Sequence, residues 1–333
     1  LPMKKWVRYS WLILIALWIL APNSYAQGFT ETSQSLGVSD GYSNGEYGGG
    51  VSFVDFNQDG LDDLTVTTGS GQNVRFFVNN GAGFDEIAPL VNNTTEVKQA
   101  LWVDYDNDGD FDLYLTSHQL NRLYKNTGDL NFQDITATCG FTDPAASQSF
   151  NACWLDYDED GLLDVIVSHR HAHLVGDLTL YHNLGNDQFE NTSVAAGFFG
   201  LGNSVLAMAT LDFNNDGWED IYVGQDYDAG NLLMQNNGNG TFSNVSAASG
   251  TNVFNDSMSA TIGDYNNDGY MDIYVTNTSP GNSLFENQGN GTFIDQAVSM
   301  GVVLNAFTWG AVFLDAEGDQ DQDLYINSIA GVP

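Results

Sequence analysis

A nine-residue acidic segment occurs six times along this chain of 333 residues. Successive copies start 49, 52, 56, 52 and 51 residues apart. They begin at Asp55, Asp104, Asp156, Asp212, Asp264 and Asp315. A unit that recurs at a period of about 50 residues is typical of a repeat architecture, in which each copy packs on its neighbours. The repeat therefore limits the fold to a row or ring of similar units.

Short strands are expected on both sides of each acidic segment. An apolar run such as Ala100–Val103 precedes the segment, and a β-branched and aromatic run such as Ile221–Val223 follows it. Two further runs come next, such as Leu284–Asn287 and Phe293–Asp295, with a Gly/Asn turn between them. Short runs separated by turn residues favour strands over helices. The sequence therefore predicts an all-β chain, a β-propeller of four-stranded blades with six repeats visible and seven expected in the complete protein.

Oxygen-donating side chains recur at positions 1, 3, 5 and 9 of the acidic segment, and Gly at position 6 allows a sharp turn in five of the six copies. We expect the carbonyl of position 7 to add a fifth oxygen. This number of hard oxygen ligands suits Ca²⁺, whereas Mg²⁺ prefers fewer protein ligands and a strict octahedron. Each blade is therefore predicted to hold a calcium loop, with up to six ions in all. The expected ligands are Asp55, Asn57, Asp59, Leu61, Asp63, Asp104, Asp106, Asp108, Asp110, Asp112, Asp156, Asp158, Asp160, Leu162, Asp164, Asp212, Asn214, Asp216, Trp218, Asp220, Asp264, Asn266, Asp268, Tyr270, Asp272, Asp315, Glu317, Asp319, Asp321 and Asp323.

Two alternatives for this segment are less consistent with the residues. An EF-hand places a bidentate Glu at position 12, but the residues here are Val66, Leu115, Val167, Val223, Val275 and Ile326. A merely solvated turn would tolerate Ser, Asn or Gly where Asp recurs at positions 1, 5 and 9. The sixth copy departs from the pattern, with Glu317 at position 3 and Gln320 in place of Gly, and is expected to be the weakest site.

The charge of the chain excludes several classes of protein. It has 43 acidic and 8 basic residues, and 26 of the acidic residues lie within the six segments. A nucleic-acid binder needs clustered basic residues, so no nucleic-acid partner is expected. The same sign of charge argues against anionic membrane surfaces. Because 42% of the residues are apolar, the chain can nevertheless form a sizeable core.

Residues 1–26 have the pattern of a secretory signal peptide. Lys4, Lys5 and Arg8 precede an apolar run over Trp11–Leu20, and Ser24–Ala26 provides small residues at a cleavage site. The run is too short for a membrane span, which needs about 20 residues. Cleavage would leave five basic and 43 acidic residues, a net charge of −38. We therefore expect a secreted protein, extracellular or at the cell surface or periplasmic, without membrane insertion after cleavage.

The repeat resembles a known family. The Asp-x-[Asp/Asn]-x-Asp-Gly-x-x-Asp segments, with turns such as Asn236–Phe242, are similar to FG-GAP/VCBS repeats over residues 28–333. Phe132–Gly140 further resembles the secreted ASPIC/UnbV, cartilage-acidic-protein-like group, although the C-terminal module of that group is not visible. The resemblance implies a calcium-stabilised β-propeller like the integrin α head, which binds or adheres to other molecules and has no catalytic residues.

The strand count predicts that the domain at 28–333 is incomplete at its C-terminus. The last unit offers only two strands, which end near Asn327, and Pro333 is interpreted as a fragment end. The segment Phe29–Ser33 resembles the fourth strand of a blade and could close the ring by pairing with the last blade.

Two smaller features leave alternatives open. Cys139 and Cys153 are the only cysteines, and secretion would permit a disulfide between them, but they could equally be two buried thiols. His169, His171 and His173 alternate along a segment that could bind Zn²⁺ or Cu²⁺, or could simply be an exposed loop.

Three functions follow as hypotheses. The first is an extracellular calcium-binding module that adheres to an unknown protein or glycan. The second is an enzyme similar to propeller-type polysaccharide lyases, for which the candidates are His169, Arg170, His171 and Tyr181. The small number of basic residues and the lack of a paired catalytic constellation argue against this enzyme. The third is a structural spacer within a larger surface protein.

Overall fold

The computed structural model separates the chain into two units, residues 1–31 and residues 32–333. It describes residues 30–38, 42, 44–46, 48–142, 148–170, 178–202, 204–226, 229–278 and 281–328. The predicted signal peptide, Phe29, His171, His173 and Pro333 lie outside the described residues. The architecture below belongs to the second unit.

The described strands form six antiparallel sheets that follow the six sequence repeats. Five of the sheets have four strands in chain order, and the sixth has two. Their bounds in the first three sheets are β1 Val51–Val54, β2 Asp63–Val66, β3 Arg75–Asn79, β4 Phe84–Ile87, β5 Val97–Val103, β6 Asp112–Ser117, β7 Arg122–Asn126, β8 Phe132–Asp134, β9 Gln148–Leu155, β10 Asp164–Arg170, β11 Leu178–Asn183 and β12 Phe189–Asn191. The remaining strands are β13 Val205–Leu211, β14 Asp220–Gln225, β15 Leu232–Asn236, β16 Phe242–Asn244, β17 Ser257–Gly263, β18 Asp272–Asn277, β19 Ser283–Asn287, β20 Phe293–Asp295, β21 Thr308–Leu314 and β22 Asp323–Ser328.

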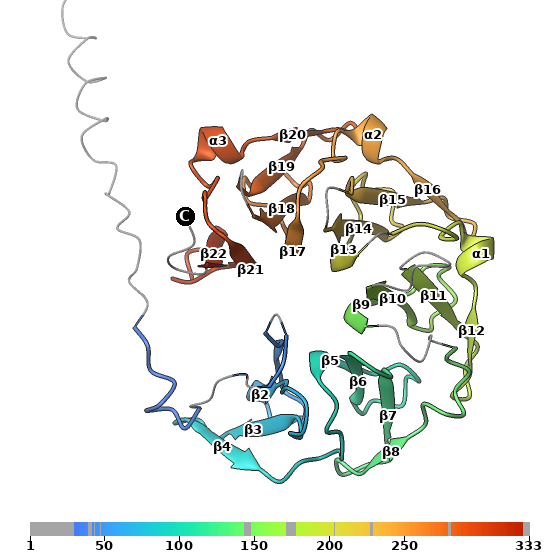
Figure 1. Cartoon of the computed structure of the whole chain (residues 1–333), viewed down its shortest axis with the longest axis vertical. Coiled ribbons are helices and arrows are strands. Elements are labelled where there is room, and N and C mark those ends of the chain that lie inside the picture. Colours follow the sequence, from blue (N-terminus) through green and yellow to red (C-terminus); the bar gives the residue numbers. More distant parts are fainter. Residues whose placement is uncertain are drawn as a thin grey trace, which may run out of the picture. The chain divides into compact units, whose positions relative to one another are not determined.

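Each sheet is one blade of a propeller. The blades succeed one another around a common centre, with first strands such as β5, β9 and β13 on the inside and fourth strands such as β8, β12 and β16 on the outside (Figure 1). The first strands of neighbouring blades are in contact from β1 to β21. The prediction of an all-β propeller of four-stranded blades is thus confirmed.

The hydrophobic core lies between the blades, because a sheet that has a neighbouring blade on each side is covered on both faces. Each cluster of buried side chains takes members from two consecutive blades. The aromatic residue at position 2 of an acidic loop contributes to this packing. Phe56 of the first loop, for example, stacks on Trp102 of the second blade with ring centroids 4.8 Å apart. The loops are therefore attached to the inter-blade core and do not project freely.

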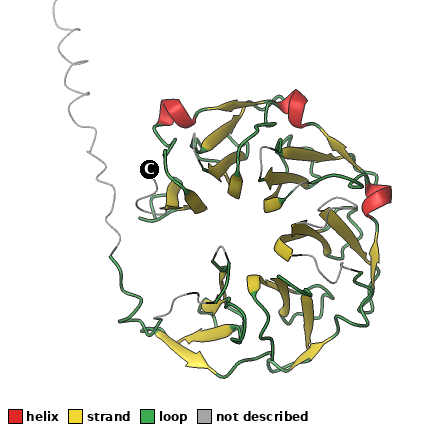
Figure 2. Cartoon of the chain, viewed as in Figure 1, coloured by secondary structure: helices red, strands yellow, loops and turns green. Residues whose placement is uncertain are grey.

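Three short helices follow the outer strands of blades three to five and lie at the rim in Figure 2. They are α1 Ser193–Ala196, α2 Ser246–Ser249 and α3 Ala297–Met300, and each ends at a glycine in the left-handed conformation. At Gly197 a Cβ atom would also lie 2.9 Å from the carbonyl oxygen of Phe242, so glycine permits close packing on the next blade. No helix among the described residues is long and apolar enough to cross a membrane.

The sixth sheet differs from the others. It consists of β21 and β22 in the described part of the chain, and its side chains Val312 and Tyr325 are about half exposed, at 46% and 48%. The strand expected at 29–33 is not found among residues 30–38, which contain a turn instead. That turn packs on the first blade, where the amide of Phe84 donates to the carbonyl of Leu36 over 2.8 Å.

Cys139 and Cys153 are not joined by a disulfide, so of the two alternatives the structure shows the unbridged one. Cys139 is buried in the cluster between blades two and three, whereas Cys153 packs on the cluster between blades three and four. Each thiol fills a different inter-blade core, which explains why the two do not meet.

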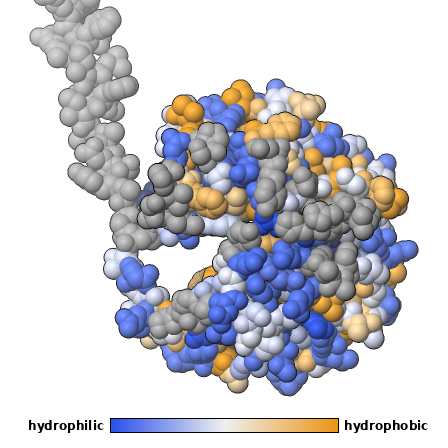
Figure 3. Space-filling model, viewed as in Figure 1, coloured by the Kyte–Doolittle hydropathy of each residue, from blue (hydrophilic) through white to orange (hydrophobic). Residues whose placement is uncertain are grey.

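Hydrophilic residues dominate the face of the molecule that Figure 3 shows, with hydrophobic residues scattered mostly towards its periphery.

Candidate metal centres

Each acidic loop is organised by the carboxylate at position 1. In the first loop, the Asp55 carboxylate accepts hydrogen bonds from the backbone amides of Asp59 and Gly60, over 2.9 and 2.8 Å. The corresponding bonds recur in all six loops. A short side chain that caps two amides of its own turn is the usual reason for Asp at such a position. The turn thereby brings positions 1, 3 and 5 close together.

Positions 4 and 6 both take the left-handed backbone conformation. Position 6 is Gly with φ between 88° and 93° in the first five loops. In the first five loops position 4 is not glycine, and φ at Gln58, Asn107, Glu159, Asn215 and Asn267 lies between 56° and 60°, whereas the sixth loop has Gly318 at this position with φ of 74°. Asn tolerates this region better than most residues, which accounts for its frequency at position 4. The sharp turn at position 6 was predicted from its Gly, whereas the conformation of position 4 was not predicted.

The Asp at position 9 begins the second strand and is fully buried in the first five loops, at Asp63, Asp112, Asp164, Asp220 and Asp272. One of its oxygens accepts a hydrogen bond from the backbone amide of an Asn that ends the third strand, over 2.7–2.8 Å. In loops three to five, the other oxygen accepts the amide of position 2, as Asp220 does from Phe213 over 3.1 Å. In loops one and two, the second oxygen of Asp63 and of Asp112 is buried without a hydrogen-bond partner in the described structure.

Burial makes these carboxylates hard to ionise. It raises the pKa of Asp112, Asp164 and Asp220 to about 7 and that of Asp272 to about 6. Neighbouring carboxylates of the same loop, such as Asp106 beside Asp112, raise the pKa further, while backbone amides lower it. A cation in the loop would remove this penalty, because it replaces the lost hydration with direct attraction.

Without calcium, the free energy of unfolding is expected to decrease as pH rises from 5 to 8. The unfolded chain releases the Asp protons near pH 4, at a pKa of about 3.9, whereas the folded chain keeps them up to pH 6–7. Between these pH values the folded state binds more protons than the unfolded state, and these protons stabilise it. Their contribution to the free energy of unfolding is complete below the unfolded pKa and is lost as pH rises through the folded pKa. Urea unfolding in EGTA at pH 5, 6, 7 and 8 measures this. Calcium-loaded protein is the control and should show the opposite trend, because the ion binds only the ionised carboxylates. A free energy that is flat or rises with pH in EGTA would contradict the assigned shifts.

The residues present fit a hard divalent ion. Ligand oxygens of Asp104, Asp106 and Asp108 lie within 4.8 Å of one another, as do those of Asp156, Asp158 and Asp164. The buried oxygens of Asp63 and Asp112, which lack a partner, supply further donors of the same chemistry. At position 3, the side-chain oxygens of the three Asn ligands accept the amide of position 5. At position 7, the amide donates to the carboxylate of position 5 in every loop. The role of the position 7 carbonyl stays a prediction.

The second loop already contains a cation of its own. The ammonium group of Lys125 lies 2.6 Å from the Asp106 carboxylate and 2.8 Å from that of Asp187. The hydrogen bond to Asp106 is the main reason that the pKa of Lys125 lies above its usual value. Lys125 therefore neutralises part of the charge that an ion would otherwise meet in this loop.

Two sets of side chains connect the loops of neighbouring blades, and neither set was predicted from the sequence. The Asn that ends a third strand donates to the position 2 carbonyl of the preceding loop in blades three to five, as Asn183 does to Tyr105 over 2.9 Å. The side-chain amide at position 4 donates to the backbone carbonyl at position 6 of the following loop, as it does at Gln58, Asn107 and Asn215. The recurrence of the Asn in five blades was a usable signal, but its partner lies 74–79 residues away, for example Tyr157 for Asn236.

The sixth loop has the same turn but a less favourable backbone. Gln320 occupies position 6 with φ of 77°, where the other loops have Gly. Its position 9 residue, Asp323, is only half-buried. The structure thus gives a physical reason for the predicted weakness of this loop without testing its affinity.

Replacing Gln320 with Gly is expected to raise the free energy of unfolding. The change removes left-handed strain of about 1–2 kcal/mol, offset in part by the greater freedom of Gly in the unfolded chain, so we expect a gain of about 0.5–1 kcal/mol. Gly217→Gln in the fourth loop is the matched reverse substitution, since a Cβ atom at Gly217 meets nothing within 4 Å. It should therefore lose stability through its backbone alone. Urea denaturation of both variants measures these changes in the free energy of unfolding. If both variants gain stability, or both lose it, the strain argument is refuted.

Three of the four lyase candidates, His169, Arg170 and Tyr181, lie among the described residues. His169 is buried with both ring nitrogens engaged, one by Ser149 at 3.0 Å and one by Thr179 at 3.1 Å. Arg170 pairs with Asp226 over 2.9 Å. Tyr181 is buried in the core between blades two and three, and its hydroxyl accepts the amide of Thr142. Each of these three side chains therefore has structural partners of its own.

Fold and loops together define a class of protein, a β-propeller whose blades each carry an acidic turn between the first and second strands. The chain belongs to the FG-GAP-like repeat family. The family profile matches five overlapping segments, which are residues 55–115, 104–167, 156–223, 212–275 and 264–326. Each match begins at position 1 of one loop and ends at position 12 of the next.

Curated relatives agree with the resemblance to the cartilage-acidic-protein-like group, which is confirmed at low identity. Cartilage acidic protein 1 of Mus musculus is 27% identical over 176 residues, which cover 49% of this chain and 26% of the relative. The Homo sapiens protein is 26% identical over 176 residues, or 49% of this chain and 25% of the relative. The chain thus matches about a quarter of the length of these relatives.

Solved structures share the fold at low sequence identity. A chain from a study of specific recognition of non-reducing terminal N-acetylglucosamine by an Agrocybe aegerita lectin has a TM-score of 0.51 and 20% identity, covering 83% of this chain and 73% of its own. A chain from the complex of BBS1N with ARL6DN has a TM-score of 0.54 and 11% identity, covering 83% and 75%. The exotype rhamnogalacturonan lyase YesX has a TM-score of 0.50 and 13% identity, covering 86% and 54%.

Proposed function

We propose that this chain is a secreted binding module whose propeller is stabilised by calcium ions in its acidic loops and which adheres to an extracellular protein or glycan. Up to six ions would be held by positions 1, 3, 5, 7 and 9 of the loops, at the residues given in the sequence analysis. The ion would supply charge neutralisation at the junction of the first and second strands of each blade. It would contribute no reaction chemistry.

The observation that carries the proposal is the fivefold recurrence of a fully buried carboxylate at position 9. A buried carboxylate costs several kcal/mol if it ionises without a counter-charge. Among the described residues, His182 contacts one of these carboxylates, that of Asp164, and Lys125 contacts Asp106 of the second loop, but no ion pair joins a basic side chain to the other four position 9 carboxylates. One divalent cation in each loop would supply the counter-charge for these position 9 carboxylates, and a donor set made only of oxygen atoms favours Ca²⁺.

The binding role rests on the class of fold and on the absence of an assembled catalytic group among the described residues. A fold-level likeness to a lectin makes glycans a reasonable first set of ligands, but fold alone does not assign a ligand. Surface plasmon resonance against glycans that end in N-acetylglucosamine or a uronate, with and without calcium, tests the glycan arm. Calcium-dependent binding to one of them supports adhesion, whereas a stable calcium-loaded protein that binds no glycan directs the search to protein partners or to a spacer role.

Whether the loops bind calcium is tested by isothermal titration calorimetry and by the melting temperature of the purified protein. Binding heat, together with a rise in melting temperature on adding Ca²⁺ but a much smaller one with Mg²⁺, is the expected result. No heat with Ca²⁺ and a melting temperature that EGTA leaves unchanged would overturn the proposal.

A further inference from the structure

The residue just before the Asn that ends the third strand occupies the same register in five blades but differs in each one. In blades one to five it is Val78, Lys125, His182, Gln235 and Glu286. Three of these side chains are known to face their own acidic loop. Lys125 contacts Asp106, His182 contacts Asp158, and Glu286 accepts the hydroxyl of Tyr265 over 2.7 Å. This register therefore adds one variable group to each loop.

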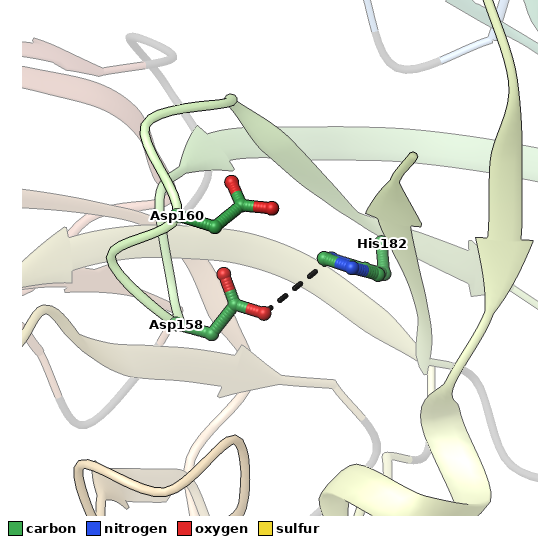
Figure 4. A group of neighbouring side chains, drawn as sticks. All are labelled: Asp158, Asp160 and His182. Carbon is green, nitrogen blue, oxygen red and sulfur yellow. Dashed lines mark ion pairs between the residues drawn. The ribbon is translucent and has the colours of Figure 1, made fainter. Parts of the chain in front are cut away.

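In the third blade, the added group is an imidazole that points into the acidic loop (Figure 4). Nδ1 of His182 lies 3.1 Å from Oδ1 of Asp164 and 3.6 Å from Oδ2 of Asp158. Ligand atoms of Asp158, Asp160 and His182 all lie within 4.8 Å of one another. The other oxygen of Asp158, Oδ1, is buried and has no hydrogen-bond partner in the described structure. Two carboxylates and one imidazole thus converge from different elements on one small volume.

The ring of His182 is held in this orientation. Its side chain is 20% exposed, and it packs edge-on against the ring of Tyr157, with centroids 5.8 Å apart. Tyr157 itself is buried between blades three and four. A ligand whose orientation is fixed by packing loses little conformational freedom when it binds an ion.

We propose that the third loop is a mixed nitrogen–oxygen centre, in which His182 joins Asp158 and Asp160 to bind a borderline divalent transition ion such as Zn²⁺ or Co²⁺. The inference rests on the proposed metal-binding role of the loops and makes this one different in kind. Imidazole nitrogen is a poor ligand for Ca²⁺, which takes oxygen donors, but a good one for the later transition ions. In the other blades with a polar residue at this register, the residue is Lys125, Gln235 or Glu286, which carries an ammonium, amide or carboxylate group instead of an imidazole.

The test uses Co²⁺ as the probe, because the energy and intensity of its visible absorption change with the donor atoms and the coordination number. Calcium-saturated protein is titrated with Co²⁺ and followed by absorption and calorimetry. Wild type should bind one equivalent with visible absorption. His182→Gln copies the residue of the fourth blade and should lose that absorption together with about tenfold or more in affinity, because even outer-shell partners of metal ligands contribute 10–100-fold.

Gln235→His is the matched gain-of-function variant, since Gln235 has the same register in the fourth blade, whose acidic loop carries Asp212, Asn214 and Asp216. It should bind a second equivalent of Co²⁺. If His182→Gln does not fold, this variant decides the matter, and failure to gain a site overturns the proposal. Co²⁺ binding that is unchanged in His182→Gln overturns it as well, because the imidazole would then act only as a hydrogen-bond donor to Asp164.

The failure of this inference is distinguishable from that of the proposed function. Protein that is stabilised by Ca²⁺ but binds no Co²⁺ at His182 rejects the mixed centre and leaves the calcium loops intact. Protein that gains no stability from Ca²⁺ rejects the proposed function, whatever Co²⁺ does.

Discussion

Adding a calcium chelator is expected to remove most of the free energy of unfolding of this protein. At 2 mM free Ca²⁺ and a Kd of roughly 10⁻⁴ M, each occupied loop contributes about 1.8 kcal/mol by mass action. Five complete loops would together give about 9 kcal/mol, which is comparable to the whole stability of a typical domain, about 5–15 kcal/mol. The effect is large because the sites are many, and no single site has to be tight.

Urea unfolding in 2 mM Ca²⁺ and in EGTA measures this loss, with Mg²⁺ at the same concentration as the control. Partial rescue by Mg²⁺ is compatible with oxygen-rich loops, but full rescue would mean that the loops do not select the larger ion. A chelator effect below about 2 kcal/mol would mean that no more than one loop is occupied, since one site alone gives about that amount.

The sequence was sufficient to predict the loops because their structure is local. Asp at position 1 caps amides four and five residues ahead, and Gly at position 6 supplies the left-handed conformation. Both relations fall within the nine-residue repeat, so each copy specifies its own turn. The strand order followed from the same repeat, because a period of about 50 residues with four short runs leaves few arrangements other than a blade.

The contacts that join one loop to the next blade could not be predicted in this way. Asn183 reaches the carbonyl of Tyr105, and Gln58 reaches that of Gly109, across a blade boundary. Such a pairing depends on the spacing and twist of two sheets, which no local pattern records. His182 is a similar case, because the sequence places it in a strand and only the fold turns it towards Asp158.

Two of the residues named for the lyase hypothesis have separate partners for a related reason. His169 and Arg170 are neighbours in sequence, but successive residues of a strand point to opposite faces. In the structure, His169 bonds to Ser149 and Thr179, while Arg170 pairs with Asp226. Adjacency in the sequence was therefore a poor guide to a shared site.

Truncating Asn236 is expected to destabilise the protein strongly with or without calcium. Its side-chain amide donates to the carbonyls of Tyr157 and Glu219 over 2.8 and 3.4 Å, and its side-chain oxygen accepts the amide of Gly238 over 3.0 Å. The residue is fully buried, so Asn236→Ala leaves these backbone groups without partners, at about 1–3 kcal/mol for each one that water cannot reach. Because some relaxation will occur, we expect a total loss of about 3 kcal/mol.

Asn237→Ala is the matched control, because the neighbouring Asn237 is exposed and its side chain bonds only within its own hairpin, to Thr241 and Ser243. Its loss should stay within about 0.5 kcal/mol. The decisive comparison is between calcium and EGTA. Asn236→Ala keeps the backbone amide that donates to Asp220. The free energy of unfolding gained on adding calcium should therefore be the same as in wild type, while the free energy of unfolding in EGTA should fall. If the stabilisation by calcium instead decreases together with the stability in EGTA, the hydrogen bond to Tyr157 holds the loops in their ion-binding form. Neighbouring blades would then bind their ions cooperatively.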